Sequence, residues 1–128
     1  MPEVPRLFRL NIEVGDLAAA KRFYETLLDQ PLRPQPGNRL YADAGSVVLQ
    51  IVGVESPHLA AKALYFQTAE LDLVHARAVS LGTLSQERVH GADAGEISVK
   101  PWGERSFYVN DPWGNPLCFV QAGTEYLG

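Results

Sequence analysis

The residues most able to do chemistry in this chain are one cysteine and three histidines, and they lie far apart. Cys118 falls in an apolar run near the end, and His58, His75 and His90 fall in three different segments. A nucleophilic thiol needs a neighbouring base or cation that lowers its pKa, and no motif brings a histidine near Cys118. We therefore expect a buried, inert cysteine and histidines that pack or face solvent, with His90 as the one candidate for a cleft position.

A row of polar residues offers a second kind of site. From residue 7 to residue 14, apolar and polar residues alternate, so one face of the expected strand carries Arg9, Asn11 and Glu13. An arginine on such a face needs a partner, because an unpaired buried charge is costly. Glu13 lies roughly 13 Å away along the strand. We expect Arg9 to meet an acid across a cleft, solvent at a wide mouth, or an anionic ligand.

Aromatic residues gather in the second half of the chain. Aromatic walls with a few placed polar groups are typical of small-molecule clefts, and they suit planar or cationic ligands. Trp113 lies in the turn DPWGN, which indicates a structural role, whereas Trp102 and Tyr65 are as well suited to a binding wall as to packing. The full set is Tyr65, Trp102, Phe107, Tyr108 and Trp113, with Tyr41 expected to face it from the other half.

Composition excludes several classes of function. The 128 residues are one domain by length, and the net charge is −4, with 15 acids against 11 Lys and Arg that do not cluster. We expect no nucleic-acid partner, because phosphate contacts need clustered cations. No run of 18 apolar residues predicts a membrane span, and the first ten residues lack the pattern of a secretory signal. The single cysteine fits a reducing cytoplasm.

The elements that must position these residues come in the same order twice. We expect a first module over about 5–54, a linker over about 55–61 and a second module over about 62–123, all in one domain, 1–128. In the first, Asp16 caps a helix that Pro31 stops; in the second, a helix ends at Gly82. The predicted strands are 7–14, 39–45, 46–54, 62–69, 83–90, 105–110 and 116–121, with 96–99 as a short strand or extended loop, and the predicted helices are 17–28 and 70–82.

The turn DPWGN joins the last two strands. Pro112 fixes φ and Gly114 allows positive φ, so the segment predicts a tight turn. Asp111 and Asn115 flank it, and their short polar side chains are suited to capping its amides.

Two segments carry a family resemblance. LNIEVGDLAAAKRFYETLL, followed by PWGERSFYVNDPWGNPLCFV, resembles the vicinal-oxygen-chelate superfamily of glyoxalase I, bleomycin- and fosfomycin-resistance proteins and extradiol dioxygenases. The spacing of the second segment is most similar to the bleomycin-resistance type. The resemblance implies an α+β fold of two βαβββ modules, which form a curled mixed sheet around a cleft, commonly in a homodimer.

The resemblance also implies where a divalent metal would be held in catalytic members. Its four ligand positions fall on Arg9, Ala63, Cys118 and either Leu49 or Gln50. Arginine stays protonated and does not coordinate, and a unit charge about 4 Å from a divalent ion adds roughly 8 kcal/mol of repulsion at a dielectric of about 20. We therefore expect no metal and no other cofactor, and standard lactoylglutathione lyase or dioxygenase chemistry is not expected.

Three functions remain open. The first is a metal-free cytoplasmic homodimer that binds a small aromatic or polar molecule, such as an antibiotic. The second is an enzyme of the same family, a lyase, isomerase or hydrolase, that uses a cleft acid such as Glu13 or a relocated metal at Glu13, His90 or Glu96. The third is a dimeric interaction module with a vestigial cleft. The predicted cleft residues are Arg9, Asn11, Glu13, Gln50, Tyr65, Gln67, Trp102, Tyr108 and Cys118.

Overall fold

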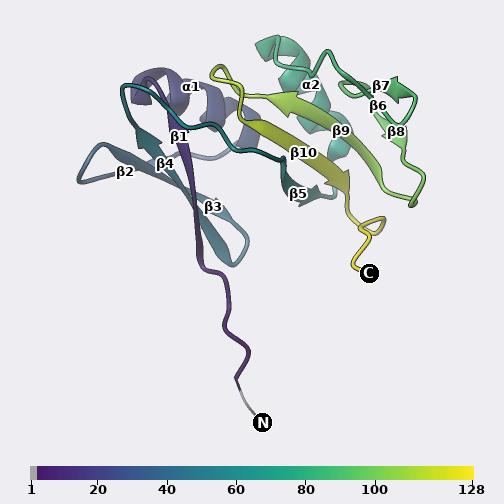
Figure 1. Ribbon diagram of the computed structural model, residues 1–128, viewed down its shortest axis with the longest axis horizontal. Helices are drawn as coiled ribbons and strands as arrows, with labels where there is room; N and C mark the ends of the chain where they lie inside the picture. Colours follow the sequence, from purple (N-terminus) through teal and green to yellow (C-terminus); the bar gives the residue numbers. More distant parts are fainter. Residues whose placement is uncertain (1–2) are drawn as a thin grey trace.

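The computed structural model describes residues 3–128 as two modules of the same plan (Figure 1); residues 1–2 of the predicted domain lie outside the described residues. The first module contains β1 (Arg9–Val14), α1 (Leu17–Leu28), β2 (Arg33–Gln35), β3 (Arg39–Ala44) and β4 (Val47–Gly53). The second contains β5 (Leu64–Thr68), α2 (Leu71–Leu81), β6 (Arg88–Val89), β7 (Ala92–Asp93), β8 (Ser98–Val99), β9 (Arg105–Asn110) and β10 (Pro116–Gln121).

Each module builds one mixed, four-stranded open sheet. The strand orders are β1-β4-β3-β2 and β5-β10-β9-β8, and β6 pairs with β7 in a separate hairpin. In each sheet the first strand is parallel to the last long strand, and the other pairs are antiparallel. The predicted α+β class and repeated βαβββ plan are therefore confirmed. The first strands, β1 and β5, each have a sheet partner on one side only.

One core joins the two modules. The alternating apolar residues of β1 and β5 face the helices, and α1 and α2 contact each other along one side of the two sheets (Figure 1). Asp16 accepts a hydrogen bond from the Ala19 amide at 3.0 Å and starts α1, and Gly82 ends α2 in the left-handed conformation, both as predicted. Neither helix in the described part of the chain has the length and apolar character needed to cross a membrane.

The DPWGN turn is capped as its sequence predicts. The Asp111 Oδ1 atom accepts hydrogen bonds from the backbone amides of Trp113 at 3.0 Å and Asn115 at 2.8 Å. Gly114 has φ of 101°, a conformation that side-chain-bearing residues rarely adopt. The indole of Trp113 packs against Gly15, where a Cβ atom would come within 2.8 Å of the ring nitrogen. Trp113 therefore has the structural role that its position predicts.

The same two polar residues connect the turn to the first module. The Tyr24 hydroxyl of α1 donates to Asp111 Oδ2 at 2.8 Å, and burial raises the pKa of this phenol well above its usual value. Asn115 Nδ2 donates to Asp111 Oδ2 and to the carbonyl of Glu13 in β1, both at 2.8 Å. Its Oδ1 accepts from the Ala60 amide of the linker at 2.8 Å. A buried polar network thus joins the last turn to α1, β1 and the linker.

One element prediction was wrong. The first helix spans residues 17–28 as predicted and ends before Pro31, with Asp29 in a left-handed conformation with φ of 52°. The predicted strand over 83–90 is mostly irregular: Leu84 makes one isolated bridge to Val109, and a turn follows in which the Ser85 hydroxyl accepts from the Glu87 amide. Only the last residues of that segment form the short strand β6.

We predict that Asn115→Ala lowers the free energy of unfolding by about 2–4 kcal/mol, because it leaves buried groups of the network without partners. Tyr24→Phe removes one hydrogen bond to a carboxylate and should cost about 1.5–3 kcal/mol. Urea unfolding measures both. Gln86→Ala, at an exposed position, is the control and should change stability by less than about 0.5 kcal/mol. An Asn115→Ala variant as stable as this control would contradict the assigned role.

Candidate functional site

The polar face of the first sheet is organised by side-chain hydrogen bonds across strands. Arg9 Nη1 donates to the Tyr41 hydroxyl at 3.1 Å, and Gln50 Nε2 donates to Asn11 Oδ1 at 2.6 Å. Gln50 lies directly between Asn11 and Tyr41 in the strand register. This settles the open register, because Leu49 faces the core and Gln50 faces the polar side.

Arg9 does not meet an acid within the described part of the chain. Its partner is a neutral phenol, and its side chain is exposed, which corresponds to the predicted solvent-facing alternative. Glu13 sits at the other end of β1, where one carboxylate oxygen accepts from the His58 amide at 2.8 Å and lies 3.6 Å from His58 Nδ1. Tyr41 belongs to this face and not to the aromatic group of the second module.

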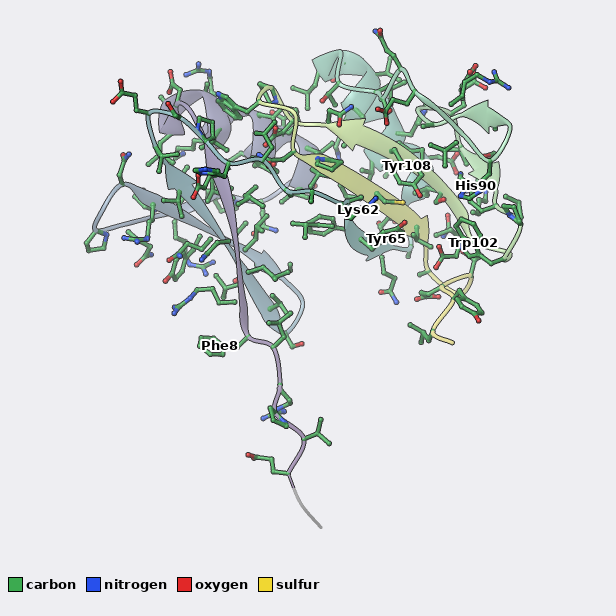
Figure 2. All side chains as sticks on the ribbon, viewed as in Figure 1. Phe8, Lys62, Tyr65, His90, Trp102 and Tyr108 are labelled. Carbon is green, nitrogen blue, oxygen red and sulfur yellow. The ribbon has the colours of Figure 1, made fainter. Side chains whose placement is uncertain are left out.

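The matching face of the second sheet has a thiol between two phenols. Cys118 of β10 lies opposite Tyr65 of β5 on one side and Tyr108 of β9 on the other. The two hydroxyl oxygens are 3.1 Å apart, and the rings meet edge to face. Figure 2 shows both tyrosines at the second sheet, with Lys62 just before β5. The structure therefore brings together three of the predicted cleft residues, Tyr65, Tyr108 and Cys118.

Burial keeps the Cys118 thiol and the Tyr108 hydroxyl protonated. It raises the pKa of the Cys118 thiol to about 11 and outweighs the hydrogen bonds from Tyr108 and Ser106 that favour the thiolate. Burial also raises the pKa of Tyr108, and the hydrogen bond with Tyr65 adds to the shift. The site accordingly presents a protonated Tyr108 hydroxyl and a protonated Cys118 thiol at neutral pH. A protonated thiol is a weak nucleophile, whereas a protonated hydroxyl can donate a hydrogen bond to a ligand.

Lys100 is a cation beside Tyr108 that sequence reasoning missed. Its Nζ atom donates to the carbonyl and hydroxyl of Ser98 at 3.2 and 3.0 Å and to the carbonyl of Ser106 at 2.9 Å. It lies 5.8 Å from the ring centre of Tyr108, and burial lowers its pKa. Nothing in the local sequence distinguishes it from a surface lysine, because its contact with the Ser106 carbonyl forms only when β8 pairs with β9.

Trp102 forms the rim of a groove beside the phenol pair. Its indole nitrogen donates to Glu104 Oε1 at 2.7 Å, and His90 packs edge to face on the indole, with ring centres 4.7 Å apart (Figure 2). Glu104 is buried, and its second oxygen accepts from the Tyr126 amide at 2.8 Å. The groove has a volume of about 560 Å³ and is lined by Tyr65, Phe66, Gln67, Trp102, Glu104, Val120, Glu125, Tyr126 and Leu127.

His90 therefore borders the groove through Trp102, and the other two histidines have structural contacts. The ring of His75 lies against Phe107 in the core, with Nε2 2.9 Å from the carbonyl of Gly95. Glu125 and Tyr126 were not predicted to contribute. They follow the last strand, and the only hint in the sequence is an aromatic residue after the final turn.

The four positions where the resemblance places metal ligands do not supply a donor set. Arg9 is a cation bound to a phenol, Ala63 has no donor, Gln50 is bound to Asn11, and Cys118 is held protonated. Across residues 3–128 no three side chains of His, Cys, Asp or Glu lie close enough together to hold a metal ion. Glu13, His90 and Glu96, the residues named for a relocated metal, belong to no such group among the residues that the structure describes.

The nine predicted cleft residues fall into two groups rather than one. Arg9, Asn11, Glu13 and Gln50 lie on the first sheet; Tyr65, Gln67, Trp102, Tyr108 and Cys118 belong to the second. None of the hydrogen bonds found among residues 3–128 joins the first group to the second. Each sheet thus carries one of the two groups.

We predict that Cys118 in the folded protein reacts at least about 100-fold more slowly with a thiol reagent at pH 8 than it does in urea. A thiol with a pKa of about 11 is roughly one part in a thousand thiolate at pH 8, against about a quarter for a free cysteine. The rate should rise about tenfold per pH unit between pH 8 and pH 10 and level off near the pKa of about 11. Absorbance of the released thiolate of the reagent measures it, and fast labelling of folded protein at pH 8 would show that the thiol is accessible and activated.

Comparison with known proteins agrees with this architecture. No curated protein matches the chain. Among solved structures, "Oxidase ChaP-H1" superposes with a TM-score of 0.75 at 21% identity, covering 98% of this chain and 100% of that one. A glyoxalase/bleomycin resistance protein from Albidiferax ferrireducens T118 gives 0.71 at 21% identity, covering 89% and 97%.

A bleomycin resistance determinant encoded on transposon Tn5 gives a TM-score of 0.71 at 15% identity, covering 93% of this chain and 99% of that one. At these identities the three likenesses establish the fold alone. The sequence profile of the Glyoxalase/Bleomycin resistance protein/Dioxygenase superfamily matches residues 6–119, which is most of the chain. The chain therefore belongs to the Glyoxalase/Bleomycin resistance protein/Dioxygenase superfamily.

Proposed function

We propose that this superfamily member is a metal-free protein that binds a small aromatic or polar molecule, an antibiotic being one candidate, without transforming it. The observation that carries the proposal is the groove beside the second sheet, with its exposed Tyr65, its rim of Trp102 and its volume of about 560 Å³. A groove of this size accommodates a drug-sized ligand. Aromatic walls contribute stacking to a planar molecule.

The polar groups near the groove support binding of a neutral or zwitterionic ligand. Tyr65 and Tyr108 present two hydroxyls 3.1 Å apart, and Gln67, two residues after Tyr65 on the same face, adds an amide. Because burial keeps Tyr108 protonated, it donates hydrogen bonds and does not act as a base. Such groups fix the orientation of a ligand whose apolar surface is held by the aromatic walls.

We further propose that the protein acts as a homodimer in the cytoplasm, with no nucleic-acid or membrane partner. The two half-sites lie on different sheets, and each sheet ends in a first strand with one free edge. A second copy that covers these edges would place the first sheet of one protomer beside the second sheet of the other, and so complete a cleft. The single free thiol is compatible with a reducing compartment.

A ligand screen tests the binding proposal. We expect a planar or polar small molecule to raise the melting temperature and to change the fluorescence of Trp102 in a Trp113→Phe background. Tyr108→Phe keeps the ring but removes the hydroxyl, and should weaken binding about 5- to 20-fold, as expected for one hydrogen bond. Weaker ligand binding by Asn11→Asp, on the first sheet, would indicate that both half-sites contribute to binding. The proposal would fail if folded protein gave no response across a library of aromatic, cationic and anionic compounds.

A second candidate function is catalysis by a cleft acid. The Glu13 carboxylate lies 3.6 Å from His58 Nδ1, and a carboxylate next to an imidazole can transfer protons. One of the similar solved structures is named an oxidase, and the fold is compatible with enzymes.

Elemental analysis separates these two functions from metal-dependent chemistry. We expect less than about 0.1 transition-metal ion per chain after dialysis, because the family positions hold a cation, a methyl group, a bound amide and a protonated thiol. One ion per chain that survives dialysis would overturn the metal-free proposal. Turnover of a bound ligand that disappears in Glu13→Gln while binding persists would favour the enzyme.

A further inference from the structure

Two walls of the groove beside the second sheet are attached to one buried side chain. Glu104 lies just before β9 and is 7% exposed. Its Oε1 atom accepts a hydrogen bond from the Trp102 indole nitrogen at 2.7 Å, and its Oε2 atom accepts one from the Tyr126 backbone amide at 2.8 Å. Trp102 and Tyr126 both line the groove. Glu104 therefore connects the turn between β8 and β9 to the segment that follows β10.

A carboxylate is suited to making both of these hydrogen bonds at once. Each partner is an N–H donor, so both arms of the side chain must end in an acceptor. A glutamine of the same shape has one carbonyl and one NH2 group, and the NH2 group would face a second donor. Among residues 3–128 neither Glu104 oxygen lies within ion-pair distance of a cationic side chain. Holding two N–H groups together is thus what the carboxylate contributes here.

The segment after β10, residues 122–128, depends on Glu104 for its position. The Glu125 carboxylate accepts a hydrogen bond from a side chain of β5. Beyond it, the one hydrogen bond that the structure describes is that of the Tyr126 amide to Glu104. The Tyr126 residue is 64% exposed and Leu127 is 92% exposed, so packing adds little to hold them. Loss of the bond to Glu104 would therefore release this wall of the groove.

The indole of Trp102 is held from two sides. Its nitrogen is bound to Glu104, and His90 packs on it edge to face (Figure 2). The turn that carries it is closed by a hydrogen bond of 2.9 Å from the Gly103 amide to the Lys100 carbonyl. Rotation of an aromatic ring about its last side-chain torsion is only weakly restricted, so the bond at the nitrogen sets the plane of the indole. That plane determines which flat molecules can stack on the ring.

We propose that Glu104 is a positioning residue that sets the affinity of the groove for an aromatic ligand, because it holds the Trp102 indole and the 122–128 segment in place together. This inference rests on the proposed function and deepens it. Walls that are already in position reduce the ordering cost of binding. Since both hydrogen bonds end on one carboxylate, a displacement of either wall also disturbs the other. Glu104 acts on the ligand through these two walls and not by direct contact.

Two signals of the ligand-free protein test whether Glu104 holds both walls. The chain has two tryptophans, so in Trp113→Phe the single indole N–H signal of a proton–nitrogen NMR spectrum belongs to Trp102. We expect Glu104→Ala to shift this signal and to make hydrogen exchange of the Tyr126 amide at least about tenfold faster. Glu87→Gln, at an exposed position, is the control and should change neither. A folded Glu104→Ala variant with both signals unchanged would overturn the proposal.

Binding of phenylnaphthylamine, a neutral aromatic dye, tests the effect on affinity. We expect Glu104→Gln to raise its dissociation constant at least about tenfold. In Trp102→Phe or Tyr126→Pro, each of which lacks one N–H donor, the same change should have less than about a threefold effect, because glutamine satisfies the donor that remains. In Tyr126→Ala, which keeps the amide, the full effect should persist. A full effect in all three backgrounds would show direct contact with the dye and overturn the positioning role.

The outcomes separate failure of this inference from failure of the proposed function. An unsubstituted protein that binds neither the dye nor any compound of the ligand screen overturns the proposed function and the role in affinity, while the two ligand-free signals still decide whether Glu104 holds both walls. Equal dye binding by folded Glu104→Gln overturns the positioning role and leaves the proposed function standing. If Glu104→Gln does not fold, Tyr126→Pro is compared with Tyr126→Ala, since only proline lacks the N–H group. Equal dye affinity of these two variants would then overturn the proposal.

Discussion

The buried carboxylate of Asp111 is the interaction on which the rest of the structure depends. It accepts hydrogen bonds from the last turn, from Asn115 and from the Tyr24 hydroxyl of α1, and Asn115 extends the network to β1 and the linker. A buried carboxylate is tolerated only when its oxygen atoms accept hydrogen bonds, so all of these donors must be in place in the folded protein. The two modules have little sequence identity to each other. This hydrogen-bond network fixes the position of one module relative to the other.

That fixed position has consequences for the site. The final turn leads directly into β10, so the network that holds the turn also fixes where Cys118 lies between the phenols of Tyr65 and Tyr108. Beside Tyr108, Lys100 uses its three donors on Ser98 and Ser106 and is held in place by the same sheet. Chemistry at this face is therefore set by the sheet rather than by loops, and burial keeps the Tyr108 hydroxyl and the Cys118 thiol protonated.

The sequence predicts most of the fold because its signals are local. Strand alternation, the Asp16 cap and the DPWGN turn each depend on neighbouring residues, and each is found as expected. Contacts between distant segments were beyond that reasoning. The Lys100 acceptors, the Glu104–Tyr126 bond and the division of the cleft residues between two sheets arise only after the strands have paired. The irregular 83–87 segment was missed because its apolar pattern resembles a strand, while only Leu84 pairs.

The positions of Tyr65 and Tyr108 on either side of Cys118 fix the distance between the two hydroxyl oxygens. Three adjacent strands set the spacing of the two hydroxyl oxygens, and sheet geometry hardly varies between related proteins. The rim beside it comes from the segments around His90 and Tyr126, which are joined to the sheet by fewer bonds. Substitutions in the rim can therefore change which molecules are admitted while the distance between the two anchoring oxygens stays constant. The choice of ligand, set by the rim, can therefore evolve separately from the hydrogen bonds that the two hydroxyls make to the ligand.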